Sequence, residues 1–196
     1  MKLKYFFAVI LVILIAQGLL SINSSYSPHY TNLNSEQSFF PDNAKYKSTN
    51  SDHFGNDNLK GAYTLIFFGY TNCPDYCPDT LVKVRKLFKS IEDKNINKNV
   101  NLLFISVDTK DKVSKIKKYV EYFDKSFVGI ETNSKNLELL TKRVGVYYKK
   151  ISNEGSIDFY DHTGAIFLTD KESKLIGIYT PPIDINNILE DVIRVF

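Results

Sequence analysis

The chain has 196 residues, 43% of them hydrophobic and 24% charged, so it is long enough for one ordinary domain and too apolar for wholesale disorder. Its formal net charge of +3, from lysines spread along the chain, is too small to indicate nucleic acid as a partner. Two cysteines in all exclude a disulfide framework that supports a small secreted fold, but they are sufficient for a functional site.

The first 22 residues are predicted to be a membrane anchor. Lys2 and Lys4 precede an apolar run from Tyr5 to Ile22, which approaches the roughly 20 residues needed to cross a bilayer. Because no small-x-small cleavage site follows, we expect a retained signal-anchor over 1–22; a cleaved signal peptide and a buried helix of the domain are the alternatives. The leading lysines indicate that the remainder of the chain is exported. A pair of thiols outside the cytoplasm must be kept reduced or bound to metal.

Residues 23–47 are rich in Ser, Asn, Tyr and Pro and have no apolar period, so we predict a tether there. The folded domain is predicted over 48–196. After turn-type sequence at 51–61, the apolar and aromatic run YTLIFFG at 63–69 is typical of a strand buried on both faces.

Beyond this strand, helix and strand patterns alternate along the chain. Apolar residues at three- and four-residue steps predict helices, and short β-branched or aromatic runs predict strands. The predicted helices are 78–94, 113–123, 134–144 and 185–194, and the further strands are 100–107, 127–130, 146–151, 164–170 and 174–180. This order indicates an α/β sandwich around one mixed sheet.

Both cysteines lie in FFGYTNCPDYCPDTL, between the first buried strand and the first helix. Sites in open α/β sheets gather at the carboxyl ends of strands, and the dipole at a helix N-terminus favours a thiolate. Pro74 and Pro78 stiffen the loop, so we expect Cys73 and Cys77 to present their sulfurs on one side. Such a pair either closes into a disulfide or binds a soft metal ion such as Cu(I) or Zn(II).

The chain has three histidines that could add a ligand. His29, in the tether, and His53, in a polar turn, are predicted to be surface residues. His162 follows Asp161 immediately before an apolar strand, and its surroundings leave open whether it is a ligand or a loop histidine with satisfied hydrogen bonds. Asp161 is the candidate for orienting the ring of His162.

Four segments, in this order, resemble the Sco/SenC family of copper-binding proteins of cytochrome oxidase assembly: FFGYTNCPDYCPDTL, LFISVD, YVEYFDKSFVGI and DHTGAIFLTDKESKLIG. The resemblance covers 46–196 and implies a thioredoxin-like three-layer sandwich with a mixed central sheet, an added β-hairpin and a preceding membrane anchor. It implies that Cys73, Cys77 and His162 bind one copper ion.

The resemblance also implies a location and partners. The protein would be a single-pass protein of the inner (cell) membrane, with its domain on the periplasmic or outer face. It would receive Cu(I) from a copper-donor protein and deliver it to the CuA centre of cytochrome c oxidase subunit II.

One segment departs from the family pattern. The family has a Pro-Glu-Arg-Asp-Thr-like loop after its SVD strand, whereas SVDTKDKVSKI in this chain lacks the proline and the arginine and is shorter. What the loop Asp108–Asp111 contributes is therefore open. Asp108 itself fits a cap of the next helix as well as a role near the copper.

The main alternative is an enzyme, a membrane-anchored thiol–disulfide oxidoreductase that uses Cys73 and Cys77 to keep oxidase cysteines reduced. It needs the same dithiol at a helix N-terminus, but the spacing is C-x-x-x-C rather than C-x-x-C. A peroxidase is disfavoured because Thr71 lies two rather than three residues before Cys73. A structural zinc site is disfavoured because three protein ligands leave one corner of the tetrahedron open.

Overall fold

The computed structural model describes residues 26–154 and 157–196, and the predicted anchor at 1–22 lies outside the described residues. The centre of the domain is a mixed sheet of seven strands in the order β1-β9-β8-β3-β4-β5-β2. Its inner strands β3, β4 and β5 are parallel, and the flanking strands run antiparallel to their neighbours. The strands are β1 (Thr31–Asn32), β2 (Lys47–Ser48), β3 (Tyr63–Gly69), β4 (Val100–Ser106), β5 (Val128–Glu131), β8 (Ile166–Thr169) and β9 (Leu175–Tyr179).

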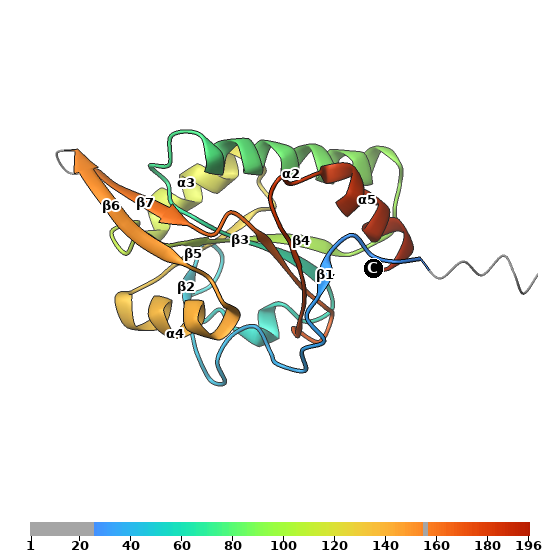
Figure 1. The fold of residues 1–196 in the computed structure, drawn as a ribbon, viewed down its shortest axis with the longest axis horizontal. Helices are drawn as coiled ribbons and strands as arrows, with labels where there is room; N and C mark the ends of the chain where they lie inside the picture. Colours follow the sequence, from blue (N-terminus) through green and yellow to red (C-terminus); the bar gives the residue numbers. More distant parts are fainter. Residues whose placement is uncertain (1–25, 155–156) are drawn as a thin grey trace, which may run out of the picture.

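Helices cover both faces of this sheet and give a three-layer sandwich (Figure 1). One face carries α2 (Tyr76–Asp93), α3 (Val113–Phe123) and α5 (Ile185–Arg194), since α2 contacts both α3 and α5. The other face carries α4 (Ser134–Val144) and the segment with the short 3-10 helix η1 (Asn56–Asn58). The four α-helices of the described residues all fall on predicted positions.

Strand β3 is buried on both faces, as its composition predicts. Leu65, Ile66, Phe67 and Phe68 are all 0% exposed, because successive side chains point to opposite faces and both faces are covered. Each such side chain contributes about 1.5–3 kcal/mol on burial. The strand that leads into the cysteines is therefore among the most firmly held parts of the domain.

The described part of the predicted tether differs from the prediction. Thr31–Asn32 pair with β9 at the edge of the sheet, Phe39 and Phe40 are fully buried, and the Tyr26 hydroxyl donates to Asp191 in α5 at 2.6 Å. A two-residue edge strand and a pair of phenylalanines leave no periodic pattern in a polar stretch. Parts of residues 26–47 are thus packed on the domain, where we predicted a tether.

A second, two-stranded sheet lies outside the main one. It consists of β6 (Tyr148–Glu154) and β7 (Ile157–His162), and it projects from the sandwich near the start of α2 (Figure 1). The resemblance implied an added hairpin, but the residue pattern alone did not predict β7 because its sequence, IDFYDH, is half polar. His162 is the last residue of β7, at the base of this hairpin.

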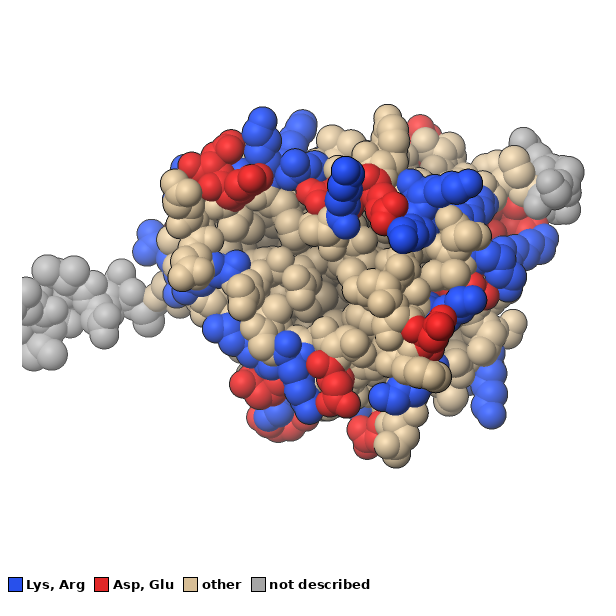
Figure 2. Space-filling view, turned by 180° about the vertical axis from the view of Figure 1, so that it is seen from behind, with Lys and Arg blue, Asp and Glu red and all other residues tan. Residues whose placement is uncertain are grey.

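The surface carries both signs of charge. On the face seen in Figure 2, basic and acidic side chains are interspersed, and several pairs lie one helical turn apart, such as Lys83–Asp79 and Lys142–Glu138. Exposed pairs of this kind contribute little to stability, because water and salt screen the attraction between the charges. The charge distribution matches the lysines and acidic residues spread along the sequence.

Among residues 26–154 and 157–196, no helix combines the length and the hydropathy required to span a bilayer.

Candidate metal centre

The fold places the two cysteines at the carboxyl end of β3. Strand β3 ends at Gly69, and α2 begins at Tyr76 after the N-cap residue Asp75. Cys77 is therefore the second residue of the helix and Pro78 is the third. The first amides of a helix have no intrahelical hydrogen-bond acceptor, so the missing N–H of Pro78 costs no hydrogen bond. This arrangement confirms the predicted strand-to-helix position of the pair.

Gly69 makes room for the inner sulfur. Cys77 is 0% exposed, and a Cβ atom on residue 69 would lie 2.9 Å from Cys77 Sγ and 2.8 Å from Cε2 of Phe104. Such contacts are too close for carbon, so any side chain here would displace the sulfur or the ring. The glycine at the end of the strand is a packing requirement of the site.

Cys73 sulfur takes the place of a helix cap. The Asp75 side chain makes no capping bond, and instead the amide of Cys77 donates to Cys73 Sγ at 3.3 Å. Neither cysteine is in a disulfide; Cys77 is buried and Cys73 is partly exposed. The hydrogen bond from the Cys77 amide therefore holds the sulfur of Cys73 beside the helix N-terminus, where the dipole favours a negative charge.

The two sulfurs differ in acidity. The hydrogen bond from the Cys77 thiol lowers the pKa of Cys73 to about 4 against the opposing effect of burial, with further lowering by His162 and by the amides of Cys77 and Asp75. The same hydrogen bond, burial and the charge on Cys73 raise the pKa of Cys77 well above its usual range. The pair therefore holds one proton, on Cys77, and one thiolate, on Cys73.

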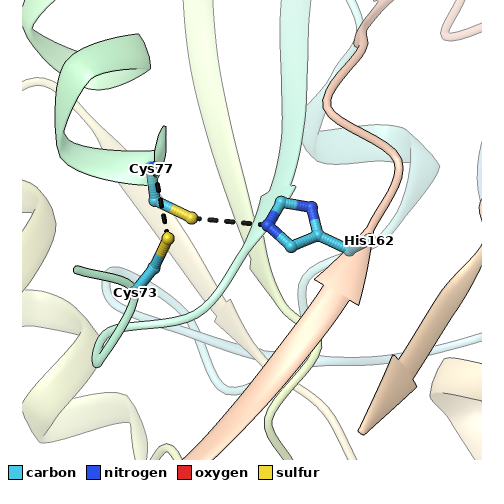
Figure 3. Close-up of side chains that lie close together, drawn as sticks. All are labelled: Cys73, Cys77 and His162. Carbon is cyan, nitrogen blue, oxygen red and sulfur yellow. Dashed lines mark hydrogen bonds between the residues drawn. The ribbon is translucent and has the colours of Figure 1, made fainter. Parts of the chain in front are cut away.

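His162 points its ring at this pair from the end of β7 (Figure 3). Its Nε2 lies 3.6 Å from Cys77 Sγ, and its Nδ1 lies 3.1 Å from the carbonyl oxygen of Thr163. A proton on Nδ1 can be donated to that carbonyl, which leaves the lone pair of Nε2 directed at the sulfurs.

The prediction that Asp161 orients the imidazole is wrong. Asp161 is exposed and lies opposite Lys149 in the hairpin, and among the described residues the hydrogen bond of His162 Nδ1 goes to Thr163.

Aromatic rings enclose the imidazole. The rings of Phe67, Tyr70 and Tyr76 lie edge-on to His162 at centroid distances of 6.1, 6.0 and 6.3 Å. The Tyr76 hydroxyl also donates to the Gly164 carbonyl at 2.6 Å, which joins the start of α2 to the end of the hairpin. Tyr76 was not predicted to belong to the site, because a tyrosine between two cysteines carries no recognisable signal.

The site opens to solvent through a shallow pocket of about 340 Å³. Two candidate ligands, Cys73 and His162, line this pocket. The other lining residues are Tyr76, Tyr160, Asp161, Gly164 and Pro181. Cys77 lies behind this pocket, in the core. The outer sulfur and the imidazole are therefore the groups that an approaching molecule meets first.

The loop after β4 lies directly beneath the site. Asp108 is 2% exposed and accepts a hydrogen bond from the Tyr160 hydroxyl at 3.2 Å, whereas α3 has Lys112 as its N-cap residue, with no side-chain cap. Of the two alternatives left open for Asp108, the helix cap is thus wrong. Asp111, which the sequence analysis missed, is fully buried and accepts from Thr71.

The donor atoms fit one soft metal ion. The three ligand atoms of Cys73, Cys77 and His162 lie within 4.8 Å of one another. Metal–sulfur and metal–nitrogen bonds of about 2.3 and 2.0 Å, at 120°, would separate sulfur from nitrogen by about 3.7 Å. The observed 3.6 Å between Cys77 and His162 is close to that value. His29 and His53 are exposed, as predicted.

Comparisons with known proteins agree with this geometry. Residues 40–196 match the SCO1/SenC family. The chain is 30% identical over 138 residues to the mitochondrial protein SCO1 homolog 1 of Arabidopsis thaliana, a match that covers 70% of this chain and 41% of that protein. It is 28% identical over 144 residues to a SCO2-like protein of Rickettsia prowazekii, covering 72% of this chain and 69% of the relative. The chain thus spans less than half of the Arabidopsis relative.

Two solved structures of similar proteins contain copper. Arabidopsis thaliana ScoI with copper bound superposes with a TM-score of 0.70 at 28% identity, covering 75% of this chain and 91% of that one. Yeast Sco1 with copper bound superposes with a TM-score of 0.69 at 25% identity, covering 76% and 84%.

The fold and the site together define a thioredoxin-like α/β protein with a Cys–Cys–His cluster at the junction of strand, helix and hairpin. Within that class, residues 40–196 match the SCO1/SenC family, and the structural neighbour from Arabidopsis is a Sco protein. The chain belongs to the SCO1/SenC family.

Proposed function

We propose that this protein binds one Cu(I) ion through the sulfurs of Cys73 and Cys77 and Nε2 of His162, and delivers it to the CuA centre of cytochrome c oxidase subunit II. The observation that carries the proposal is the 3.6 Å separation of Cys77 Sγ from His162 Nε2, between residues 85 positions apart in the chain. The copper-bound Arabidopsis and yeast relatives support it.

The donor set favours Cu(I) over other ions. Two thiolate-type sulfurs and one imidazole are soft ligands, which suit Cu(I) at low coordination number. Zinc prefers a fourth ligand, and the cluster of His, Cys, Asp and Glu side chains found among the described residues has three members.

The arrangement of the site suits transfer by ligand exchange. A thiolate of a partner protein reaches the pocket at Cys73 and His162, because both line it, whereas Cys77 is 0% exposed behind them. The outer ligands can therefore be replaced one at a time while the inner sulfur still holds the cargo. The ion is passed on, and taken up from a copper-donor protein, without being released to water.

The proposal includes a location. With residues 1–22 as a single-pass anchor, the domain would lie on the outer face of the inner membrane, where the oxidase subunit presents its copper centre. Fractionation of cells expressing the full chain, with protease added to intact spheroplasts, checks this. Protection of the domain from the protease would contradict the outward orientation.

Copper counting tests the ligand set. The full chain, purified in detergent, is loaded with Cu(I), and bound copper and affinity are measured by competition with a Cu(I) chelator. We expect one copper per chain in the wild type and a loss of affinity of at least about ten-fold in Cys73→Ala and His162→Ala. His53→Ala, at an exposed histidine, is the matched control. Unchanged affinity in His162→Ala would show the three-ligand site to be wrong.

A thiol–disulfide oxidoreductase is the second candidate. Its supporting observation is the lowered pKa of Cys73 beside the thiol of Cys77, since a stabilised thiolate with a neighbouring thiol is the reactive arrangement in such enzymes. The reduction potential of the pair and turnover with a disulfide peptide taken from the oxidase subunit measure this activity. Inertness toward that peptide would remove it.

A further inference from the structure

Asp111 is a carboxylate with no exposure to solvent and several donors around it. Its Oδ2 accepts from the amide of Thr71 and the hydroxyl of Ser106, each at 2.8 Å. Its Oδ1 accepts from Thr71 Oγ1 at 2.5 Å and from Lys115 Nζ at 2.9 Å. Burying a charge is costly unless it is paired and hydrogen-bonded, so this set of donors is what stabilises Asp111 in the core.

These bonds attach the cysteine loop to the end of β4. Thr71, two residues before Cys73, is held by Asp111 through both its amide and its hydroxyl. Lys115 also donates to Asn72 Oδ1 at 3.0 Å. Two consecutive residues of the loop are therefore fixed to the turn after β4 and to the first turns of α3, immediately before the outer sulfur.

The other end of the same turn holds the histidine strand. Asp108 Oδ1 accepts from the Tyr160 hydroxyl at 3.2 Å, and Tyr160 is two residues before His162 on β7. Side chains two apart on a strand share a face, so this bond positions the face that carries the imidazole. The Tyr70 and Tyr160 rings also pack edge-on, 5.3 Å apart.

We propose that the turn Asp108–Asp111 is a brace that sets the distance between the two halves of the metal site. Asp111 acts on Cys73 through Thr71, and Asp108 acts on His162 through Tyr160, so both are positioning residues and neither touches the ion. The metal-binding part of this inference rests on the proposed function. The brace itself requires no metal: it requires only that the hydrogen bonds of Asp111 and Asp108 hold the cysteine loop and the β6–β7 hairpin in place.

Conservative variants separate positioning from general stability. Thr71→Val removes the hydroxyl bond to Asp111 and keeps the shape, and Thr71→Ser restores the hydroxyl. Thr141→Val is the control, because the hydroxyl of Thr141 is also hydrogen-bonded, to the carbonyl oxygen of Leu137 at 2.8 Å, and Thr141 is more deeply buried than Thr71. It lies in α4, on the opposite face of the sheet. Tyr160→Phe tests the other end of the brace.

The Cys77 amide offers a readout that needs no metal. As the second residue of α2 it has no intrahelical acceptor, and its hydrogen bond goes to Cys73 Sγ. Its hydrogen exchange, measured residue by residue with NMR in the full chain, therefore reports whether the outer sulfur stays beside the helix. Cu(I) affinity and thermal unfolding are measured on the same samples.

In Thr71→Val we expect Cys77 amide exchange to accelerate several-fold and Cu(I) affinity to fall by about ten-fold, as for other groups that orient metal ligands. Thr71→Ser should restore both, and Tyr160→Phe should lower the affinity while leaving Cys77 exchange unchanged. Thr141→Val should change thermal stability alone. Wild-type exchange at Cys77 and wild-type affinity in Thr71→Val would overturn the brace.

Failure of the proposed function looks different. If the wild type binds no Cu(I), the copper proposal falls, and the Cys77 exchange rates still decide for or against the brace.

Discussion

The two halves of the candidate metal site are built in different ways. The cysteine half belongs to the core: it follows strand β3, in which residues 65–68 are 0% exposed, and its inner sulfur packs against Gly69. The histidine half lies on the β6–β7 hairpin, which forms a separate sheet. Individual side-chain contacts hold that hairpin to the domain: Tyr160–Asp108, Lys110–Asp158 and Tyr76–Gly164.

This difference shows which part of the site is rigid and which part can move. Moving the inner sulfur requires a change in close-packed core, which is costly. Moving the imidazole requires the loss of a few hydrogen bonds, each contributing about 0.5–1.5 kcal/mol. The proposed function, in which the site holds Cu(I) and then releases it, needs both properties, and this fold provides them in different elements.

The largest expected effect comes from filling the space beside the inner sulfur. Gly69→Ala places a Cβ within 2.9 Å of Cys77 Sγ and 2.8 Å of Phe104, and overpacking of this kind costs about 1–3 kcal/mol. We expect lower stability in chemical denaturation together with a clear loss of Cu(I) affinity, because the sulfur itself is displaced.

Gly61→Ala is the control for that variant. Residue 61 has a φ of +84° with nothing within 4 Å of a new Cβ, so alanine costs about 1–2 kcal/mol through backbone strain alone. It should lower stability to a similar degree and leave Cu(I) affinity intact. Parallel losses of affinity in both variants would contradict a specific role for Gly69.

The next effect is a difference in reactivity between the two thiols. Cys73 is partly exposed with a pKa lowered to about 4, whereas Cys77 is buried with a raised pKa. In the metal-free protein, iodoacetamide should therefore modify Cys73 first, at a rate nearly constant from about pH 5.5 to 8, since its thiolate is already formed throughout that range. Peptide mass spectrometry measures the rates. Equal labelling, or a rate that rises steeply toward pH 8, is the contrary result.

The smallest effect concerns the attachment of the hairpin. Asp158 is 3% exposed and pairs with Lys110 at 2.7 Å and Lys150 at 2.6 Å, and Lys110 and then Lys150 lower its pKa. The pKa of this carboxylate is lower in the folded state than in the unfolded state, where it is about 3.9. The ionised carboxylate therefore stabilises the fold at pH values above about 3.9, and this stabilisation is lost as the pH falls through the pKa of the folded state. Acid should therefore loosen the hairpin.

Amide chemical shifts of β6 and β7, followed by NMR from pH 6 downward, measure this loosening. Asp158→Asn should remove the pH dependence of those shifts and leave the shifts of α2 unaffected. Shifts in the hairpin that titrate identically in the variant would show that another group controls its attachment.

Much of the fold follows from local pattern. The helices and the buried strands β3 and β4 were predicted because their apolar residues repeat with the period of the element that they form. The cysteine half of the site was also predicted from local pattern. Cys73 and Cys77 are close in sequence, and the strand before them and the proline-containing helix start after them place both residues without contacts from the rest of the chain. The resemblance then supplied His162, which its own residues left undecided.

Other features depend on contacts between distant residues, and no local pattern contains them. The pairing of Thr31–Asn32 with β9, the hydrogen bonds of Asp111 to Thr71, and the Thr163 carbonyl in place of Asp161 as the partner of His162 are of this kind. The sequence by itself determined the dithiol and the strand–helix frame around it, because those rest on hydrophobic period and chain proximity. The tertiary structure alone decided which groups orient the imidazole and hold the loop, because a buried polar group bonds to whichever partner the packing brings within reach.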